Sequence, residues 1–307
     1  MKIKEFETFV VGNPPPRFGG RYFLFVKLVT DTGIVGYGEV YAATFGAETI
    51  AGMIADTAER HVVGHDPFHI EALFHRVYGS GYSLRPDISL VGVLSGLEMA
   101  CWDIIGKACD KPVYELLGGQ VHDRLRTYTY LYPADGDVYP SDQDDQHIYV
   151  NADVAAQRAL DYVEQGFTAV KFDPAGAYTV YDGGMPTLEE LDRSERFVTT
   201  IRAAVGDRAD LLFGTHGQFT AAGALRLAKR LEASDPLWFE EPTPPENSRE
   251  MARVAAGTTI PVATGERLCT KHEFAHVLQA GAAAILQPNL GRVGGLLEAK
   301  KIAALAE

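Results

Sequence analysis

Short apolar segments that end on polar residues recur through the second half of the chain. The segments AVKFDP, LLFGTHGQ, LWFEEP, PVATGERL and AILQPNL carry, in turn, Lys171, His216, Glu240, Glu266 and Gln287. Amphipathic helical patterns fill the intervals between them. Repeated strand and helix units indicate a parallel sheet whose strands are neighbours and whose carboxyl ends share one edge. The spacing therefore predicts a (β/α) barrel with polar side chains gathered at its mouth.

The number of predicted strands limits how far this barrel extends. We expect six strands, near residues 126–132, 168–173, 210–214, 236–240, 261–265 and 283–287. Six strands do not close an eight-stranded barrel. Residues 301–307 have the pattern of the end of a sixth helix. We expect a (β/α)8-type TIM barrel that is truncated after about six strands.

The first part of the chain has a different pattern, typical of a mixed α+β domain. Its helical spacing is strongest over residues 95–108, and an antiparallel sheet is expected from the β-forming segments 3–11, 22–30 and 35–40. A new strand pattern begins near Leu125, after a break at residues 121–124. We therefore place an α+β domain at residues 1–123 and the barrel domain at residues 124–307.

Composition excludes several classes of protein. The chain has 307 residues, 46% of them hydrophobic, and a net charge of -13. An acidic surface disfavours nucleic acids and anionic membranes, since both attract Lys and Arg. The N-terminus lacks the apolar stretch of a signal peptide, and no run approaches the roughly 20 apolar residues of a membrane span. An odd number of cysteines suits a reducing compartment, so we expect a cytoplasmic protein.

Alternation along the strands indicates which polar side chains face the barrel axis. Successive residues of a strand point to opposite faces. Glu240 is therefore expected to point inward, and its neighbour Glu241 away from the axis. Lys171 and Asp173 share one face by the same rule.

The motifs together resemble a known family. The run SGLEMACWDIIGKACDKPVYELLGG at residues 95–119, followed by KFDP, THGQ, WFEEP, GERL and LQPNLGRVGG, is similar to the mandelate racemase/muconate lactonizing enzyme branch of the enolase superfamily. KFDPAG followed by a His-Gly run and EEP most resembles aldonic-acid dehydratases, of the gluconate and galactonate type. In this family the N-terminal domain is a capping domain that contributes to substrate specificity.

The resemblance implies a Mg²⁺ site. Relatives bind Mg²⁺ through three acidic residues, and Glu240 and Glu266 match two of these positions. The third position is Gly214, which has no side chain. Asp173 or water would supply the missing oxygen, and the alternative role for Asp173 is an ion pair with Lys171. Structural ion pairs are likewise the alternative for the two glutamates.

Two residues match the family's acid/base and cationic positions. Lys171 is implied either to contact the substrate carboxylate or to act as a base, with a structural ion pair as the alternative. His216 resembles the histidine that acts on the departing hydroxyl, because an imidazole can give or take a proton near neutral pH. Its alternative role is that of a core histidine.

Five further residues are candidates for substrate binding. Gln287 and Asn289 close the sixth strand, and Asn289 occupies a position where related dehydratases often carry Asp. Arg17, Tyr41 and Arg85 belong to loops of the N-terminal domain and are expected to read substrate hydroxyls. For Arg17, in a segment rich in proline and glycine, a solvated turn is the alternative.

The resemblance implies a Mg²⁺-dependent dehydratase (hydro-lyase) acting on a sugar acid. The reaction removes the proton next to the carboxylate and the 3-hydroxyl, and gives a 2-keto-3-deoxy acid. The alternatives are a racemase, epimerase or cycloisomerase, which begin from the same enolate, and a non-catalytic relative that binds sugar acids. A homo-oligomer is also implied.

Overall fold

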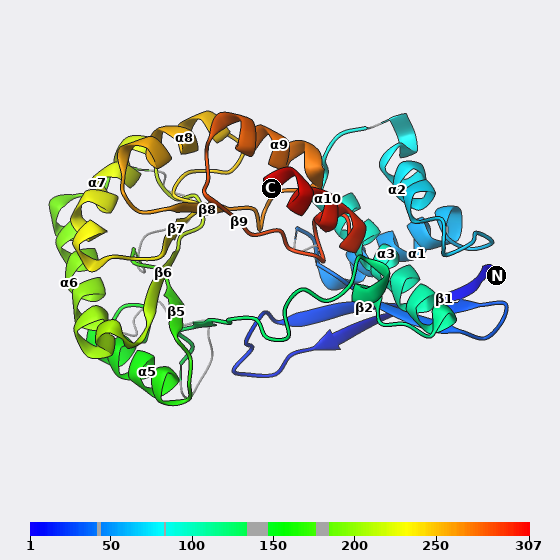
Figure 1. Cartoon of the computed structure of the whole chain (residues 1–307), viewed down its shortest axis with the longest axis horizontal. Coiled ribbons are helices and arrows are strands. Elements are labelled where there is room, and N and C mark those ends of the chain that lie inside the picture. The colour runs from blue at the N-terminus through cyan, green and yellow to red at the C-terminus, as the bar shows by residue number, and fades with distance from the viewer. Residues whose placement is uncertain (42–43, 83, 134–146, 176–183) are drawn as a thin grey trace.

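A computed structural model describes residues 1–41, 44–82, 84–133, 147–175 and 184–307. An antiparallel sheet with its helices precedes a parallel sheet with an arc of helices around it (Figure 1). The acidic segment at residues 134–146, which from its sequence we expect to be a solvated loop, lies outside the described residues. The predicted α/β class, with an N-terminal capping domain and a barrel-like second domain, is confirmed.

The N-terminal sheet has the order β1-β2-β3, and all its neighbours are antiparallel. Its strands are β1 (Ile3–Gly12), β2 (Tyr22–Thr30) and β3 (Val35–Val40). The helices beside it are α1 (Ala47–His61), α2 (Ile70–Tyr78), α3 (Ile88–Cys109) and the short α4 (Val113–Leu116). The three strand predictions for this region are confirmed within one residue at each end.

Glycines in β3 allow helix α3 to lie directly on the sheet. A Cβ at Gly36 would lie 2.2 Å from the carbonyl oxygen of Ala100, and one at Gly38 would lie 1.9 Å from that of Gly96. Any side chain at either position would therefore separate the helix from the strand. Helix α3 is long and apolar enough to cross a membrane, but 72% of its most apolar window is buried. Its composition is explained by its place in the core of the capping domain.

The second sheet has six parallel strands in the order β4-β5-β6-β7-β8-β9. These are β4 (Thr129–Tyr130), β5 (Ala169–Phe172), β6 (Asp210–Gly214), β7 (Trp238–Glu240), β8 (Val262–Thr264) and β9 (Ile285–Leu286). Each falls within one of the six predicted segments. β4 and β9 form the two edges, and they do not pair with each other. Around the sheet lie α5 (Ala152–Glu164), α6 (Leu188–Val205), α7 (Ala221–Leu231), α8 (Ser248–Gly257), α9 (Thr270–Ala280) and α10 (Leu296–Ala306).

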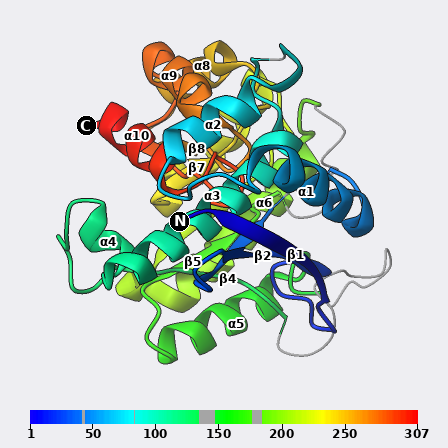
Figure 2. The ribbon, with the colours of Figure 1, turned by 90° about the vertical axis from the view of Figure 1, so that its right-hand side faces the viewer.

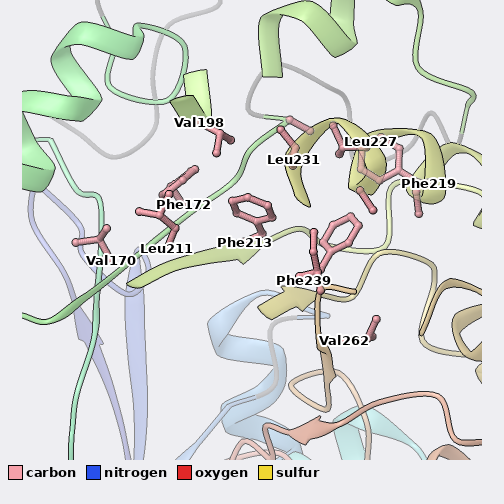
Figure 3. Packing of buried hydrophobic residues seen from close by; sticks show 14 of the residues in the cluster. Val170, Phe172, Val198, Leu211, Phe213, Phe219, Leu227, Leu231, Phe239 and Val262 are labelled. Carbon is pink, nitrogen blue, oxygen red and sulfur yellow. The ribbon is translucent and has the colours of Figure 1, made fainter. Parts of the chain in front are cut away.

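Strand alternation divides this sheet into an outer and an inner face. Phe172, Phe213 and Phe239 point toward the helices and pack side by side, with ring centroids 5.7 and 6.3 Å apart (Figure 3). Each such buried phenyl ring contributes roughly 1.5–3 kcal/mol through burial. The inner face carries Leu212 and Trp238, which form a smaller cluster with Ala169, Ala263 and Ile285. The inner face is the one that leads to the polar residues at the strand ends.

The two parts of the chain meet where α3 contacts the start of α10. The Glu98 carboxylate of α3 accepts hydrogen bonds from the backbone N–H groups of Leu296 and Leu297, at 2.9 and 3.0 Å. Ser95 Oγ accepts a further bond from Gly294 N at 2.8 Å. Helices α3 and α10 lie close together in both views (Figures 1 and 2). The domain division at residues 123 and 124 stays a prediction.

Candidate functional site

A cavity of about 380 Å³ opens on the inner face of the parallel sheet. Its polar lining comes from four of the strands or their ends: Lys171, Glu240, Glu266, Gln287 and Asn289. Its apolar lining comes from Tyr128, Trp238, Ile285 and Pro288. Five of the ten residues predicted for the site therefore line one cavity. Their convergence follows from the topology, because parallel neighbours bring their carboxyl ends to one edge.

Lys171 and Glu240 form a buried ion pair in this cavity. Lys171 Nζ lies 2.7 Å from both carboxylate oxygens of Glu240 and donates a hydrogen bond to Oε1. The side chains are 12% and 2% exposed. Burial alone lowers the pKa of Lys171, but attraction to Glu240 and the hydrogen bond to it outweigh burial and raise that pKa. Lys171 is thus a cation at neutral pH, which favours the predicted carboxylate contact over the predicted role as a base.

The Lys171 side chain lies against Gly214 of the strand between β5 and β7. Gly214 pairs with Glu240, while Lys171 pairs with Leu212 two residues earlier on β6. A Cβ built on Gly214 would lie 2.5 Å from Lys171 Cε. The lysine therefore reaches Glu240 across the space that a side chain at residue 214 would fill.

His216 and Glu266 face each other beside this ion pair. His216 Nε2 lies 4.0 Å from Glu266 Oε1, and the side chains are 43% and 35% exposed. The backbone N–H of His216 donates to Gln218 Oε1 at 2.7 Å, which fixes the turn that carries the imidazole. Gly265, with a φ of 142°, precedes Glu266, and a Cβ there would lie 2.9 Å from the backbone of Gln287. Glycine is thus required for the turn that brings Glu266 to the site.

The structure does not bring Asp173 to the two glutamates. Its Oδ2 accepts a hydrogen bond from Gln218 Nε2 at 3.0 Å, and its Oδ1 accepts one from Ala175 N at 2.8 Å. Asp173 lines a different cavity, of about 160 Å³, beside Tyr130 and Phe172. The geometry therefore gives no support to the predicted metal-ligand role, and Lys171 takes Glu240 as its partner.

Glu241 behaves as strand alternation predicts. It is fully buried on the side away from the cavity and accepts a hydrogen bond from Arg267 Nε at 2.6 Å. Burial raises the pKa of the Glu241 carboxyl to about 7, although Arg267 opposes this effect. Arg267 thus braces a carboxylate outside the cavity.

The three capping-domain candidates do not line the cavity. Arg17 lines a separate hollow with Arg21 in the loop after β1. The Tyr41 ring lies under the Arg292 guanidinium, 4.3 Å from ring centroid to Cζ, and its backbone N–H bonds Gly291 O. Arg85 is exposed just before α3. Their substrate-binding roles stay predictions.

Sequence reasoning missed two aromatic walls and one orienting amide. The Tyr128 and Trp238 rings contact each other edge to face at 5.3 Å inside the cavity. Both were detectable in principle, since Trp238 has the same parity as Glu240 and Tyr128 belongs to the alternating run LRTYTYLY. Gln218 is 1% exposed and links His216 to Asp173. No local signal distinguishes Gln218 from an ordinary loop glutamine.

The donor set does not fit the magnesium site of the predicted type. Within the described residues, no three Asp, Glu, His or Cys side chains form a group that could hold a metal ion. Gly214 contributes no ligand, and the Lys171 ammonium already occupies the position of a cation on Glu240. Mg²⁺ requires near-octahedral oxygen ligands, so it would have to displace this ammonium.

The fold and the cavity define a class of protein: a (β/α)-barrel enzyme with an N-terminal capping domain and its site at the carboxyl ends of the strands. Residues 18–118 match the mandelate racemase/muconate lactonizing enzyme N-terminal domain, and residues 154–307 match the enolase C-terminal domain-like family. The chain belongs to the mandelate racemase/muconate lactonizing enzyme family of the enolase superfamily.

This chain covers about 70% of the length of the named relatives that it matches. D-galactonate dehydratase of Ralstonia nicotianae is 36% identical over 307 residues, which are 100% of this chain and 72% of the relative. D-xylonate dehydratase of Haloferax volcanii is 34% identical over 305 residues, 98% of this chain and 68% of the relative. A crystal structure of a mandelate racemase/muconate lactonizing enzyme from Sulfitobacter sp. superposes with a TM-score of 0.93 at 54% identity, covering 100% and 76% of the two chains.

Proposed function

We propose that this protein is a hydro-lyase that dehydrates a sugar acid of the aldonate class. The observation that carries the proposal is the whole-chain similarity to D-galactonate and D-xylonate dehydratases, combined with a cavity lined by Lys171 and Glu266, with His216 lying 4.0 Å from Glu266. The cavity's size suits a sugar acid, and its lining combines a cation with amide side chains.

The reaction removes one molecule of water from the substrate. The C2–H and C3–O bonds break: the His216 imidazole takes the C2 proton and passes it to the departing 3-hydroxyl, which leaves as water. The enol formed tautomerises to a 2-keto-3-deoxy acid. The exposed position of His216 beside Glu266 permits this transfer. Lys171 contacts the substrate carboxylate from the inner face of the sheet. Gln287 and Asn289 offer amide groups to the hydroxyls.

The predicted Mg²⁺ ion is not part of this proposal. Relatives of this superfamily generally use Mg²⁺, which stabilises the enolate as a Lewis acid. In this chain, Glu240 and Glu266 remain without a third acidic ligand in the described residues. The proposal therefore rests on the side chains of the chain itself.

We also propose a homo-oligomeric, cytoplasmic protein. The association follows from the family, whose members join through capping and barrel surfaces. Three free cysteines, Cys101, Cys109 and Cys269, support a reducing compartment.

A screen of the full protein against aldonic and aldaric acids, with detection of 2-keto acids, tests the function. We expect one or a few acids to give product. His216→Asn should lower the rate by about 10²- to 10⁴-fold, the range for loss of a general acid or base. His276→Asn, on the exposed face of α9, is the matched control and should leave the rate unchanged.

The same screen distinguishes the alternative functions. Deuterium exchange at C2 without 2-keto acid would indicate a racemase, epimerase or cycloisomerase in place of a dehydratase. Binding of a sugar acid with neither product nor exchange would indicate a non-catalytic relative.

A further inference from the structure

Gly214 has no conformational reason to be glycine. It ends strand β6 in regular parallel pairing with Glu240, and its φ does not lie in the left-handed region. Any residue can adopt this backbone conformation. The explanation must therefore be the space beside it.

That space is filled by one side chain, Lys171. A Cβ at residue 214 would lie 2.5 Å from Lys171 Cε, 3.3 Å from Cγ and 3.4 Å from Cδ. These are three successive parts of one alkyl chain, so the lysine runs across the glycine for most of its length. An alanine would push the lysine aside, and an acidic residue would compete with Glu240 for the lysine ammonium.

Both carboxylates of the cavity also face a basic group of the chain. Glu240 is paired with the Lys171 ammonium, which lies 2.7 Å from both of its oxygens. Glu266 faces the His216 imidazole at 4.0 Å, its partner when the ring is protonated. Two carboxylates that each face a basic group offer a divalent cation much less attraction than three unpaired carboxylates.

We infer that this site is metal-independent, with the Lys171 ammonium, lodged in the space left by Gly214, taking the place of the divalent cation as the resident charge on Glu240. The ammonium has three donors, and those not directed at Glu240 are available to the carboxylate of a ligand in the cavity. The identity of that ligand as a sugar acid rests on the proposed function. The inference that the site needs no metal does not rest on the proposed function.

Mn²⁺ binding, measured by electron paramagnetic resonance without any sugar acid, tests the inference directly. The wild-type protein should bind no Mn²⁺ at the site. The double variant Lys171→Met with Gly214→Asp removes the ammonium and adds the third carboxylate. Its affinity for Mn²⁺ should therefore be higher than that of the wild type by a factor of about 100 or more. The matched control, Lys171→Met with Gly214→Ala, makes the same space without a ligand and should not gain binding.

Two results would overturn the inference. One is Mn²⁺ binding by the wild-type protein that Glu240→Gln abolishes, and this comparison does not depend on whether the double variant folds. The other is a folded double variant, verified by circular dichroism, that binds Mn²⁺ no better than its alanine control.

Calorimetry with D-galactonate as the probe separates this inference from the proposed function. Binding in the presence of EDTA that Lys171→Met abolishes would support metal independence, and 2-keto acid formation under the same conditions would support both. Binding or dehydration that requires added Mg²⁺ would overturn metal independence and leave the dehydratase proposal intact. If D-galactonate and the other acids screened neither bind nor react, the proposed function fails, and the Mn²⁺ measurement still decides the inference.

Discussion

Glu98 at the junction with α10 and Glu240 in the cavity are both buried, at 1% and 2% exposure, but their surroundings differ. Glu98 accepts from three neutral donors: the backbone N–H groups of Leu296 and Leu297 and the indole of Trp102. Glu240 faces the single ammonium of Lys171 in a cavity. A carboxylate saturated by backbone and indole donors stabilises a junction between elements, whereas one neutralised by a side-chain cation beside a cavity can share that cation with a ligand.

The pKa of Glu98 reflects its neutral surroundings. Burial raises the pKa of the Glu98 carboxyl to about 7, because its three neutral donors offset only part of the desolvation. Residue 295 must be glycine for this contact to form, because its φ is 91° and a Cβ there would lie 2.1 Å from Glu98 Oε2. The junction is therefore a tightly packed site in which neutral hydrogen bonds replace an ion pair.

Loss of Lys171 should produce the largest functional effect. Lys171→Met should lower 2-keto acid formation by about 10²- to 10³-fold, the range for losing one preorganised electrostatic group. Lys271→Met is a matched comparison, because Lys271 also lies beside a buried glutamate, Glu298, at 3.1 Å, but outside the cavity. Rates measured for both variants should differ by this factor, and equal rates would contradict the distinction drawn between the two regions.

Removal of Glu98 should produce the largest effect on stability. Glu98→Ala leaves two backbone N–H groups and an indole N–H without acceptors, so the free energy of unfolding should fall by about 4 kcal/mol. Urea denaturation measures the change. A loss of well under 1 kcal/mol would mean that water replaces the carboxylate without cost.

The pH dependence of the free energy of unfolding should differ between the wild type and Glu98→Gln. Because the folded-state pKa of about 7 lies above the ordinary value of 4.5, the stability contributed by the protonated carboxyl is present below pH 4.5 and is lost as the pH rises toward 7. The loss across this window is about 3 kcal/mol at most. Glu98→Gln should flatten this part of the stability curve, as followed by urea denaturation at each pH. An unchanged slope would assign the dependence to another group, with Glu241 the first candidate.

Loss of a single donor at the junction should produce the smallest effect. Trp102→Phe removes the indole N–H that bonds Glu98 Oε1 at 2.8 Å and keeps an aromatic ring in place. The free energy of unfolding should fall by about 1 kcal/mol, the net value of one hydrogen bond. The rate of 2-keto acid formation should not change, and a large loss of activity would show that the junction and the cavity are coupled.

Much of the architecture was predictable from local patterns. All six parallel strands and the three antiparallel strands fall where the hydrophobic pattern placed them. Alternation also predicted that Glu240 faces the interior and that Glu241 does not. These features repeat at short range, because strand parity and helix periodicity depend only on neighbouring residues.

The contacts of the site were less predictable. Asp173 was expected beside Lys171 or the glutamates, but it bonds Gln218, which is remote in sequence. Arg17, Tyr41 and Arg85 were expected at the site as loop residues, but none of them lines the cavity, because that depends on how the capping domain packs on the barrel. Tertiary packing determines which of several possible partners a side chain contacts, and local sequence patterns carry no information about it.

The sequence by itself determined the succession of strands and helices, the family, and the set of polar residues at the strand ends. Only the tertiary structure decided that Lys171 reaches across Gly214 to Glu240 and that Glu98 holds the start of α10. The physical reason is the range of the interactions. Propensity and alternation act within a few residues, whereas a buried charge selects its partner by distance and desolvation among groups that folding brings together from distant parts of the chain.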